Sequence, residues 1–230
     1  MAEDQRETEV KFCVRNLPQP PPPSGHLPQI QRILGRLGGG LIQPRTFEVN
    51  LRFDTSNGDL QRAGRVLRLR KDDHAHLTYK DDSQNIEGAL TRREIEFVVD
   101  DFDSAKKFIE ALGYEVAFIY EKYRTTYALS PQTSEVFKDL RGLEAHIMLD
   151  ELPYGNFIEI EGELDMLRPI AEELQLDWNK AIPASYHALF ERLRKSRGLP
   201  FRDLTFENFK GIKVSPKDMM IIYADNRSTL

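Results

Sequence analysis

The stretch ETEVKFCVR, residues 7–15, alternates charged and apolar side chains. One parity carries the charges and the other the hydrophobes: Glu7, Glu9, Lys11 and Arg15 against Val10, Phe12 and Val14. Because successive side chains of a strand point to opposite faces, this pattern predicts a strand with one charged face and one apolar face. A helix would scatter the same charges around its axis.

The same alternation recurs in seven further segments. They lie at residues 47–54, 67–70, 76–80, 92–97, 122–127, 146–150 and 158–161. Eight strands linked mostly by short turns can close on themselves, which removes the exposed edges that invite aggregation. We therefore predict an α+β protein built on an eight-stranded closed antiparallel β-barrel, a tunnel with a charged lumen and an apolar exterior.

Helices are predicted to cover that exterior. Four amphipathic stretches separate or follow the strands, at residues 28–37, 104–112, 166–176 and 185–197, with Asp103 and Asp165 expected to open the second and third. The proline-rich segment 18–24 and residues 130–142 are predicted to be irregular. We expect the tunnel domain to span residues 1–210, followed by a tail, residues 211–230, without assignable structure.

Composition limits the partners that this protein can have. With 37 acidic and 32 basic residues the formal net charge is −5, which indicates neither a nucleic-acid partner nor a membrane surface. Cys13 is the only cysteine, so the chain has no internal disulfide and no cysteine-based zinc site. No stretch approaches the about 20 apolar residues of a membrane span. We expect a cytoplasmic protein that binds any anion locally.

Three pairs of glutamates predict a metal site inside the tunnel. Residues two apart on a strand point the same way, with roughly 6.6 Å of rise between them. The pairs are Glu7 with Glu9, Glu94 with Glu96, and Glu159 with Glu161. Carboxylates crowded into one cavity repel each other, and their oxygens are the ligands that Mg²⁺ and Mn²⁺ prefer. A divalent cation is therefore the expected cofactor.

The cations on the same faces predict the ligand. They are Lys11, Arg52, Arg68, Arg70, Lys80 and Arg124, more than internal pairing requires. An unpaired buried charge costs several kcal/mol. A polyphosphate chain would satisfy both sets, because its oxygens accept bidentate hydrogen bonds from guanidinium groups and also bridge metal ions. A solvated sheet face can also be charged, but the recurrence over eight segments favours a common lumen.

The ordered motifs resemble those of a known family. Residues 7–11, ETEVK, resemble the E-x-E-x-K signature of the CYTH superfamily, also called triphosphate tunnel metalloenzymes. The resemblance extends through Arg68-Leu69-Arg70, Lys80, Glu94-Ile95-Glu96, Arg124, Asp150 and the stretch FIEIEG at residues 157–162, over about four-fifths of the chain. It implies an eight-stranded tunnel that acts on a triphosphate with Mg²⁺ or Mn²⁺, as in inorganic triphosphatases, thiamine triphosphatases and class IV adenylate cyclases.

The resemblance also implies roles for individual residues. Phosphates would be held by Lys11, Arg68, Arg70, Lys80 and Arg124, to which the charge pattern adds Arg52. Metals would be held by Glu7, Glu9, Asp150, Glu159 and Glu161. Glu94 and Glu96, with Lys11, would form the catalytic set, one glutamate orienting water. Where several triphosphatases place a lysine in the C-terminal helix, this chain has Ser185-Tyr186, while Lys180 nearby is expected to lie on the surface.

Several functions fit these residues. The favoured one is hydrolysis of inorganic triphosphate, and the main alternative is a class IV adenylate cyclase that converts ATP to cyclic AMP and pyrophosphate. Thiamine triphosphate is a third possible substrate. A non-catalytic binder of polyphosphate or nucleotide is a further reading, and a lipocalin-like carrier would need its hydrophobes to face inward. His76 and His146 are expected to be structural or solvent-facing, and Trp178 to be a packing residue.

Overall fold

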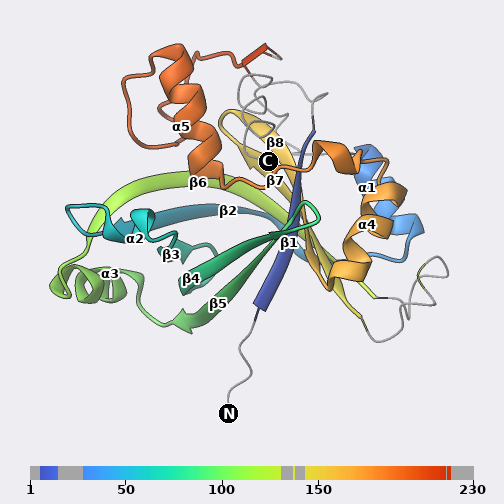
Figure 1. Ribbon diagram of the computed structural model, residues 1–230, viewed down its shortest axis with the longest axis horizontal. Coiled ribbons are helices and arrows are strands. Elements are labelled where there is room, and N and C mark those ends of the chain that lie inside the picture. Colours follow the sequence, from blue (N-terminus) through green and yellow to red (C-terminus); the bar gives the residue numbers. More distant parts are fainter. Residues whose placement is uncertain (1–5, 15–27, 131–136, 138–142, 216, 219–230) are drawn as a thin grey trace.

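Eight antiparallel strands form a closed barrel in the computed structural model, which describes residues 6–14, 28–130, 137, 143–215 and 217–218. The strands are β1 (Arg6–Val14), β2 (Gly40–Asp54), β3 (Val66–Lys71), β4 (Ala75–Ile86), β5 (Ala89–Val99), β6 (Glu115–Leu129), β7 (Ala145–Leu152) and β8 (Gly155–Gly162). Around the barrel they follow the order β1-β5-β4-β3-β2-β6-β7-β8, and β8 pairs with β1 to close it (Figure 1). The predicted fold is confirmed.

The register of the strands brings the charged parities onto one face. Glu9 lies opposite Glu161, and Lys11 opposite Glu159, where β1 pairs with β8. Because side chains of directly opposed residues point to the same side of a sheet, each strand adds its charges to a common lumen. One difference concerns β2, which begins seven residues before the predicted start. Register shifts around Gln43 interrupt the alternation there, so the pattern was not visible in the sequence.

Two helices cover the apolar outside of β1, β7 and β8. They are α1 (Pro28–Arg36) and α4 (Leu164–Glu173), which lie together on one side of the barrel (Figure 1). Leu34 and Leu167 are fully buried and belong to one cluster with Ile158 and Ile160 of β8. The Trp178 ring, in the 3₁₀-helix η2 (Trp178–Lys180), packs on Phe12 with ring centres 6.1 Å apart, as predicted.

Helix α5 (Tyr186–Arg197) packs over β6 and β8 (Figure 1). Its partners Tyr120 and Phe157 lie on the charged, lumen-facing sides of these strands. The prediction that this helix covers the apolar exterior is therefore wrong, because α5 covers lumen-facing side chains instead. The Ser185 hydroxyl accepts a hydrogen bond from the Ala188 amide at its start, and Gly198, with φ 61°, ends it. Leu189 and Phe190 of α5 are fully buried in this contact. The described part of the tail continues this packing, because Ile212 contacts the same cluster.

Helical cover ends at β5. α3 (Phe102–Ala111) and the short α2 (Asp59–Arg62) lie on the side away from α1 and α4 (Figure 1), while Ile95 and Phe97 on the outer face of β5 remain 52% exposed. The predicted caps were wrong for two helices. Asp101, not Asp103, accepts a hydrogen bond from the Ser104 amide at α3. α4 starts after Glu163 without a side-chain cap.

Some predictions fall on residues outside the described part. The proline-rich segment 18–24, residues 219–230 of the tail and most of residues 130–142 belong there. In the part of the chain that is described, no helix combines the length and the apolar character needed to cross a membrane.

Candidate active site

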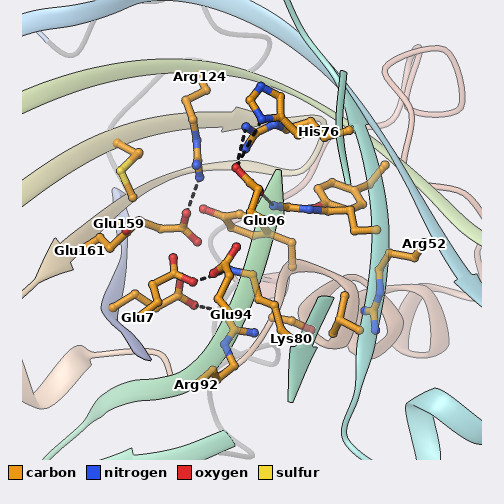
Figure 2. A pocket seen from close by; sticks show the side chains of 18 of the residues that line it. Glu7, Arg52, His76, Lys80, Arg92, Glu94, Glu96, Arg124, Glu159 and Glu161 are labelled. Carbon is orange, nitrogen blue, oxygen red and sulfur yellow. Dashed lines mark hydrogen bonds and ion pairs between the residues drawn. The ribbon is translucent and has the colours of Figure 1, made fainter. Parts of the chain in front are cut away.

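The barrel encloses a charged cavity of about 570 Å³. It is lined by six glutamates, which are Glu7, Glu9, Glu94, Glu96, Glu159 and Glu161. All six predicted phosphate-binding residues line it as well, together with Arg6, Arg92 and Lys122. Their side chains converge from opposite walls of the barrel (Figure 2). The sequence-predicted residues therefore lie together, with Asp150 as the exception.

Lys80 joins two of the predicted acidic residues. Its Nζ atom lies 2.6 Å from Glu7 Oε2 and 2.5 Å from Glu94 Oε2. At the next lumen-facing position of β1, two residues after Glu7, Glu9 accepts a hydrogen bond from Arg92 at 2.8 Å. Burial alone would raise the pKa of Glu7, but Lys80 and Arg92 hold it below its ordinary value. Glu7 is therefore ionised at neutral pH, as a metal ligand must be.

The carboxyl group of Glu161 has a raised pKa. Burial and the neighbouring Glu7 carboxylate raise the pKa of Glu161 to about 8, and the two side chains share a hydrogen bond. At neutral pH Glu161 thus holds a proton. Glu7 and Glu161 share this proton, and a metal cation that bound between the two carboxylates would take its place.

Arg124 and Lys11 bracket Glu159. The Arg124 guanidinium pairs with Glu159, and Lys11 Nζ lies 3.1 Å from the other carboxylate oxygen. Lys11 also donates to the Ala184 carbonyl at 3.0 Å, which ties the wall of the cavity to the segment before α5. Although Glu159 is buried, Lys11 and Arg124 hold its pKa well below the ordinary value. It carries a negative charge between two cations.

Asp150 points to the lumen side of β7, directly opposite Arg124, but the side chains of Lys122, Arg124 and Tyr186 cover it, so that it does not line the cavity. It is fully buried, and its oxygens accept hydrogen bonds from Arg124 Nε at 2.7 Å, Lys122 Nζ at 3.0 Å and the Tyr186 hydroxyl at 2.8 Å. With these donors, both oxygens are occupied. Its role as a metal ligand stays a prediction, whereas the contacts are those of a group that orients Arg124, Lys122 and Tyr186.

Glu96 holds the arginine pair of β3. Arg68 and Arg70 lie 3.2 and 3.3 Å from its two oxygens, and the Thr78 hydroxyl donates to it at 2.6 Å. Burial opposes ionisation of Glu96, but Arg70 and Arg68 lower its pKa below the ordinary value. His76, expected to be structural or solvent-facing, also lines the cavity, with Nδ1 3.5 Å from Glu96.

Internal pairing is more complete than the sequence suggested. Five of the six predicted phosphate-binding cations have a carboxylate partner: Lys11, Arg68, Arg70, Lys80 and Arg124. The prediction that these cations exceed the number of internal carboxylate partners is therefore wrong for these five residues. Of the six, Arg52 alone has a side chain without an ion pair or hydrogen bond to the described residues. A phosphate ligand must consequently exchange with existing ion pairs.

Sequence reasoning assigned no role to four residues of the site, which are Glu48, Arg92, Lys122 and Tyr186. Lys122 and Glu48 are 2% and 1% exposed, with Nζ and Oε2 3.3 Å apart. Burial opposes ionisation of Glu48, yet Lys122 and Arg124 lower its pKa to about 2. Lys122 and Arg92 share the charged parity of their strands, so their positions were readable from the sequence. Tyr186 was noted, but its contact with Asp150 depends on how α5 packs.

The donor set fits a divalent cation, although the present side-chain positions do not form a metal cage. Over the described residues, no three histidine, cysteine, aspartate or glutamate side chains are arranged to hold an ion. Glu7, Glu9 and Glu161 nevertheless offer oxygen ligands from two adjacent strands, and Glu161 holds a replaceable proton. These three residues fit Mg²⁺ or Mn²⁺ by their chemistry. Binding would require Lys80 and Arg92 to move aside.

The lowered pKa of His187 predicts how the stability of the protein depends on pH. Burial and the nearby Arg52 charge lower the pKa of His187 to about 4, from 6.5. The unfolded chain therefore takes up this proton at a higher pH than the folded protein, and stability is lost as the pH falls from about 6.5 to about 4. Between about pH 7 and about pH 4.5, the wild type should lose on the order of 1–2 kcal/mol more than His187→Gln. Urea unfolding of metal-free protein across this range measures the difference, and parallel curves for the two proteins would contradict it.

Comparison with solved structures supports the fold. A proposed adenylate cyclase of Vibrio parahaemolyticus is 20% identical with a TM-score of 0.63, and the match covers 82% of this chain and 99% of that protein. The PH1012 protein of Pyrococcus horikoshii is 22% identical with a TM-score of 0.56, covering 78% of this chain and 96% of its own. At these identities the likeness shows a shared fold. No curated protein matches the chain.

A family model decides the membership. The CYTH domain matches residues 5–166, which include β1 to β8 and the start of α4. This range covers most of the chain and contains every predicted site residue. The chain therefore belongs to the CYTH domain family.

Proposed function

We propose that this protein is a divalent-metal-dependent phosphohydrolase whose substrate is inorganic triphosphate. The observation that carries the proposal is the cavity itself, where nine lysines and arginines face six glutamates within one barrel lumen. Its cationic excess suits a polyanion, and its carboxylates suit the metal that accompanies one. CYTH proteins act as triphosphatases or adenylate cyclases, so the family supports chemistry on a triphosphate.

The arginine pair of β3 is the principal phosphate clamp of this proposal. Arg68 and Arg70 already point at one carboxylate, Glu96, and phosphate oxygens accept the same forked hydrogen bonds. A phosphate that displaces Glu96 keeps both guanidinium groups paired. Glu96 then remains held by the Thr78 hydroxyl and is free to orient a water molecule.

Lys80 couples the phosphate site to the acidic residues. Its Nζ atom bridges Glu7 and Glu94. When Lys80 turns to a phosphate oxygen, Glu7 becomes available to the metal and Glu94 can accept a proton from an attacking water. A bound divalent cation supplies positive charge at the phosphate oxygens. Glu7, Glu9, Glu159 and Glu161 are the residues proposed to hold it, while Lys11 and Arg124 keep Glu159 in place.

An adenylate cyclase is the second candidate. The neighbour from Vibrio parahaemolyticus carries that proposed activity, and the same cradle would hold ATP with its α-phosphorus open to the ribose 3′-hydroxyl. The two functions differ in their products. Cyclisation releases pyrophosphate and cyclic AMP, whereas hydrolysis of tripolyphosphate releases phosphate and pyrophosphate.

One experiment separates the candidates. The protein is incubated with Mg²⁺ or Mn²⁺ and, separately, with tripolyphosphate, ATP and thiamine triphosphate, and the products are identified by ion chromatography. We expect phosphate and pyrophosphate from tripolyphosphate, in a reaction that EDTA stops. Cyclic AMP as the main product from ATP would replace the first candidate by the second. Metal-dependent binding of all three without turnover would make the protein a sensor.

A further inference from the structure

Arg52 occupies a separate part of the cavity. It lines the cavity from β2, where its cross-strand neighbours are Arg68 on β3 and Phe118 on β6. In the close view it lies on the opposite side from Glu7 and Glu159, where the acidic residues gather (Figure 2). It is thus at the far end of the charged lumen from the proposed metal ligands.

The positive charge of Arg52 has no partner among the described residues. The nearby acid on the same strand, Asp54, is already engaged, because its oxygens accept hydrogen bonds from the amides of Leu60 at 2.8 Å and Gln61 at 2.9 Å. Its cross-strand neighbour Arg68 is another cation, and like charges placed opposite one another destabilise a sheet. Burial lowers the pKa of the Arg52 guanidinium. Arg52 is half-buried, and a partly desolvated cation in such surroundings favours an anion beside it.

Two described aromatic residues near Arg52, Phe118 and Tyr120, present no free face to a planar base. Phe118 is 2% exposed, and the His187 ring covers it with centres 4.2 Å apart. Tyr120 is 8% exposed, stacks on Phe118 and accepts a hydrogen bond from Arg68 at 3.4 Å. Base recognition usually relies on an accessible aromatic surface. A compact anion whose oxygens accept hydrogen bonds from a guanidinium and an imidazole fits this corner better.

We propose that Arg52, with His187 beside it, forms a subsite for a fourth phosphoryl group, so that the cavity prefers linear tetrapolyphosphate to tripolyphosphate. The inference rests on the proposed function, because the other cations must hold the first three phosphoryl groups. Those cations are paired with carboxylates around Glu7, Glu96 and Glu159. Arg52 extends the same row of charges beyond them.

Binding to the metal-free protein tests the subsite. Isothermal titration in EDTA with tripolyphosphate, tetrapolyphosphate and ATP is carried out on the wild type, Arg52→Gln and Arg62→Gln. Arg62 is an exposed arginine on α2 and controls for the loss of one positive charge. We expect the wild type to bind tetrapolyphosphate about tenfold more tightly than tripolyphosphate, the change that one charge-assisted hydrogen bond supplies. In Arg52→Gln the ratio should fall to about one, with tripolyphosphate affinity changed less than about threefold.

The outcomes distinguish the subsite from the proposed function. Equal affinities in the wild type, or equal losses for both polyphosphates in Arg52→Gln, would overturn the subsite while tripolyphosphate hydrolysis stands. A loss confined to ATP would overturn it in favour of a nucleoside contact. Failure of the wild type to hydrolyse tripolyphosphate with metal would instead remove the proposed function, whatever the binding ratio. Arg52→Gln removes a half-buried charge that has no ion-pair partner among the described residues, so its thermal midpoint should equal or exceed that of the wild type.

Discussion

Glu7→Gln is expected to lower the turnover of tripolyphosphate by about 100-fold or more while the protein stays folded. Glu7 lies between Lys80 and Glu161, and it is the ionised partner of that carboxyl pair. A neutral amide in its place has the same size but contributes no negative charge to a divalent cation. The measurement is the initial rate as a function of Mg²⁺ and Mn²⁺ concentration.

Stability should change in the opposite direction from activity in this variant. Lys80 keeps its 2.5 Å contact with Glu94 when Glu7 is neutral, so no buried cation loses its last partner. The Glu7 charge also helps to hold Glu161 in its protonated form at neutral pH, at a cost in stability, and its removal lowers the pKa of Glu161 towards the ordinary value. We expect an unchanged or higher thermal midpoint for Glu7→Gln.

The matched control is Glu110→Gln, on the exposed face of α3, where the glutamate side chain is 42% exposed and pairs only with Lys106. It should leave rate and metal dependence unchanged. If Glu7→Gln kept full metal-dependent activity, the assignment of Glu7 to the metal would be wrong. A variant that lost activity because it unfolded would reveal itself in the thermal midpoint.

Asp150→Asn is expected to lower the free energy of unfolding by about 3–5 kcal/mol. Its carboxylate is fully buried and faces two cations, Lys122 and Arg124, together with the Tyr186 hydroxyl. An amide cannot offset both positive charges, and its NH₂ group would point at donors. Tyr186→Phe, which removes one neutral donor, should cost only about 1 kcal/mol.

Urea unfolding of the metal-free protein measures both changes and decides the role of Asp150. If Asp150 acts chiefly as a metal ligand, its substitution should weaken metal binding and leave the metal-free protein about as stable as the wild type. A loss below about 1 kcal/mol would therefore contradict the structural role. The contacts of Asp150 predict a large loss without metal, accompanied by lower activity because Arg124 loses the group that orients it.

Much of the lumen was predictable because side chains of a strand alternate with a period of two. Glu7, Glu9 and Lys11 must share a face in any strand that includes them, and the same holds for Glu159 with Glu161. The repeated inversion then indicated which face is inside. This reasoning also placed Lys122 and Arg92 on the charged face, although neither was assigned a role.

Pairing between charges could not be read in the same way. The partners of Asp150 come from β6 and α5, and those of Glu96 come from β3 and β4. Which cation meets which carboxylate depends on strand order and register, and β1 pairs with β5 and β8 rather than with its neighbour in sequence. Sequence reasoning therefore overestimated the surplus of free cations.

The sequence by itself determined the eight strands, the charged interior and the residues that face it, because these follow from local alternation along each strand. Only the tertiary structure decided that Asp150 is covered by Tyr186 inside the barrel and that Arg52 has no carboxylate partner among the described residues. These properties depend on distances between segments far apart in the chain. Burial and electrostatic interaction are set by such distances, which no local pattern specifies.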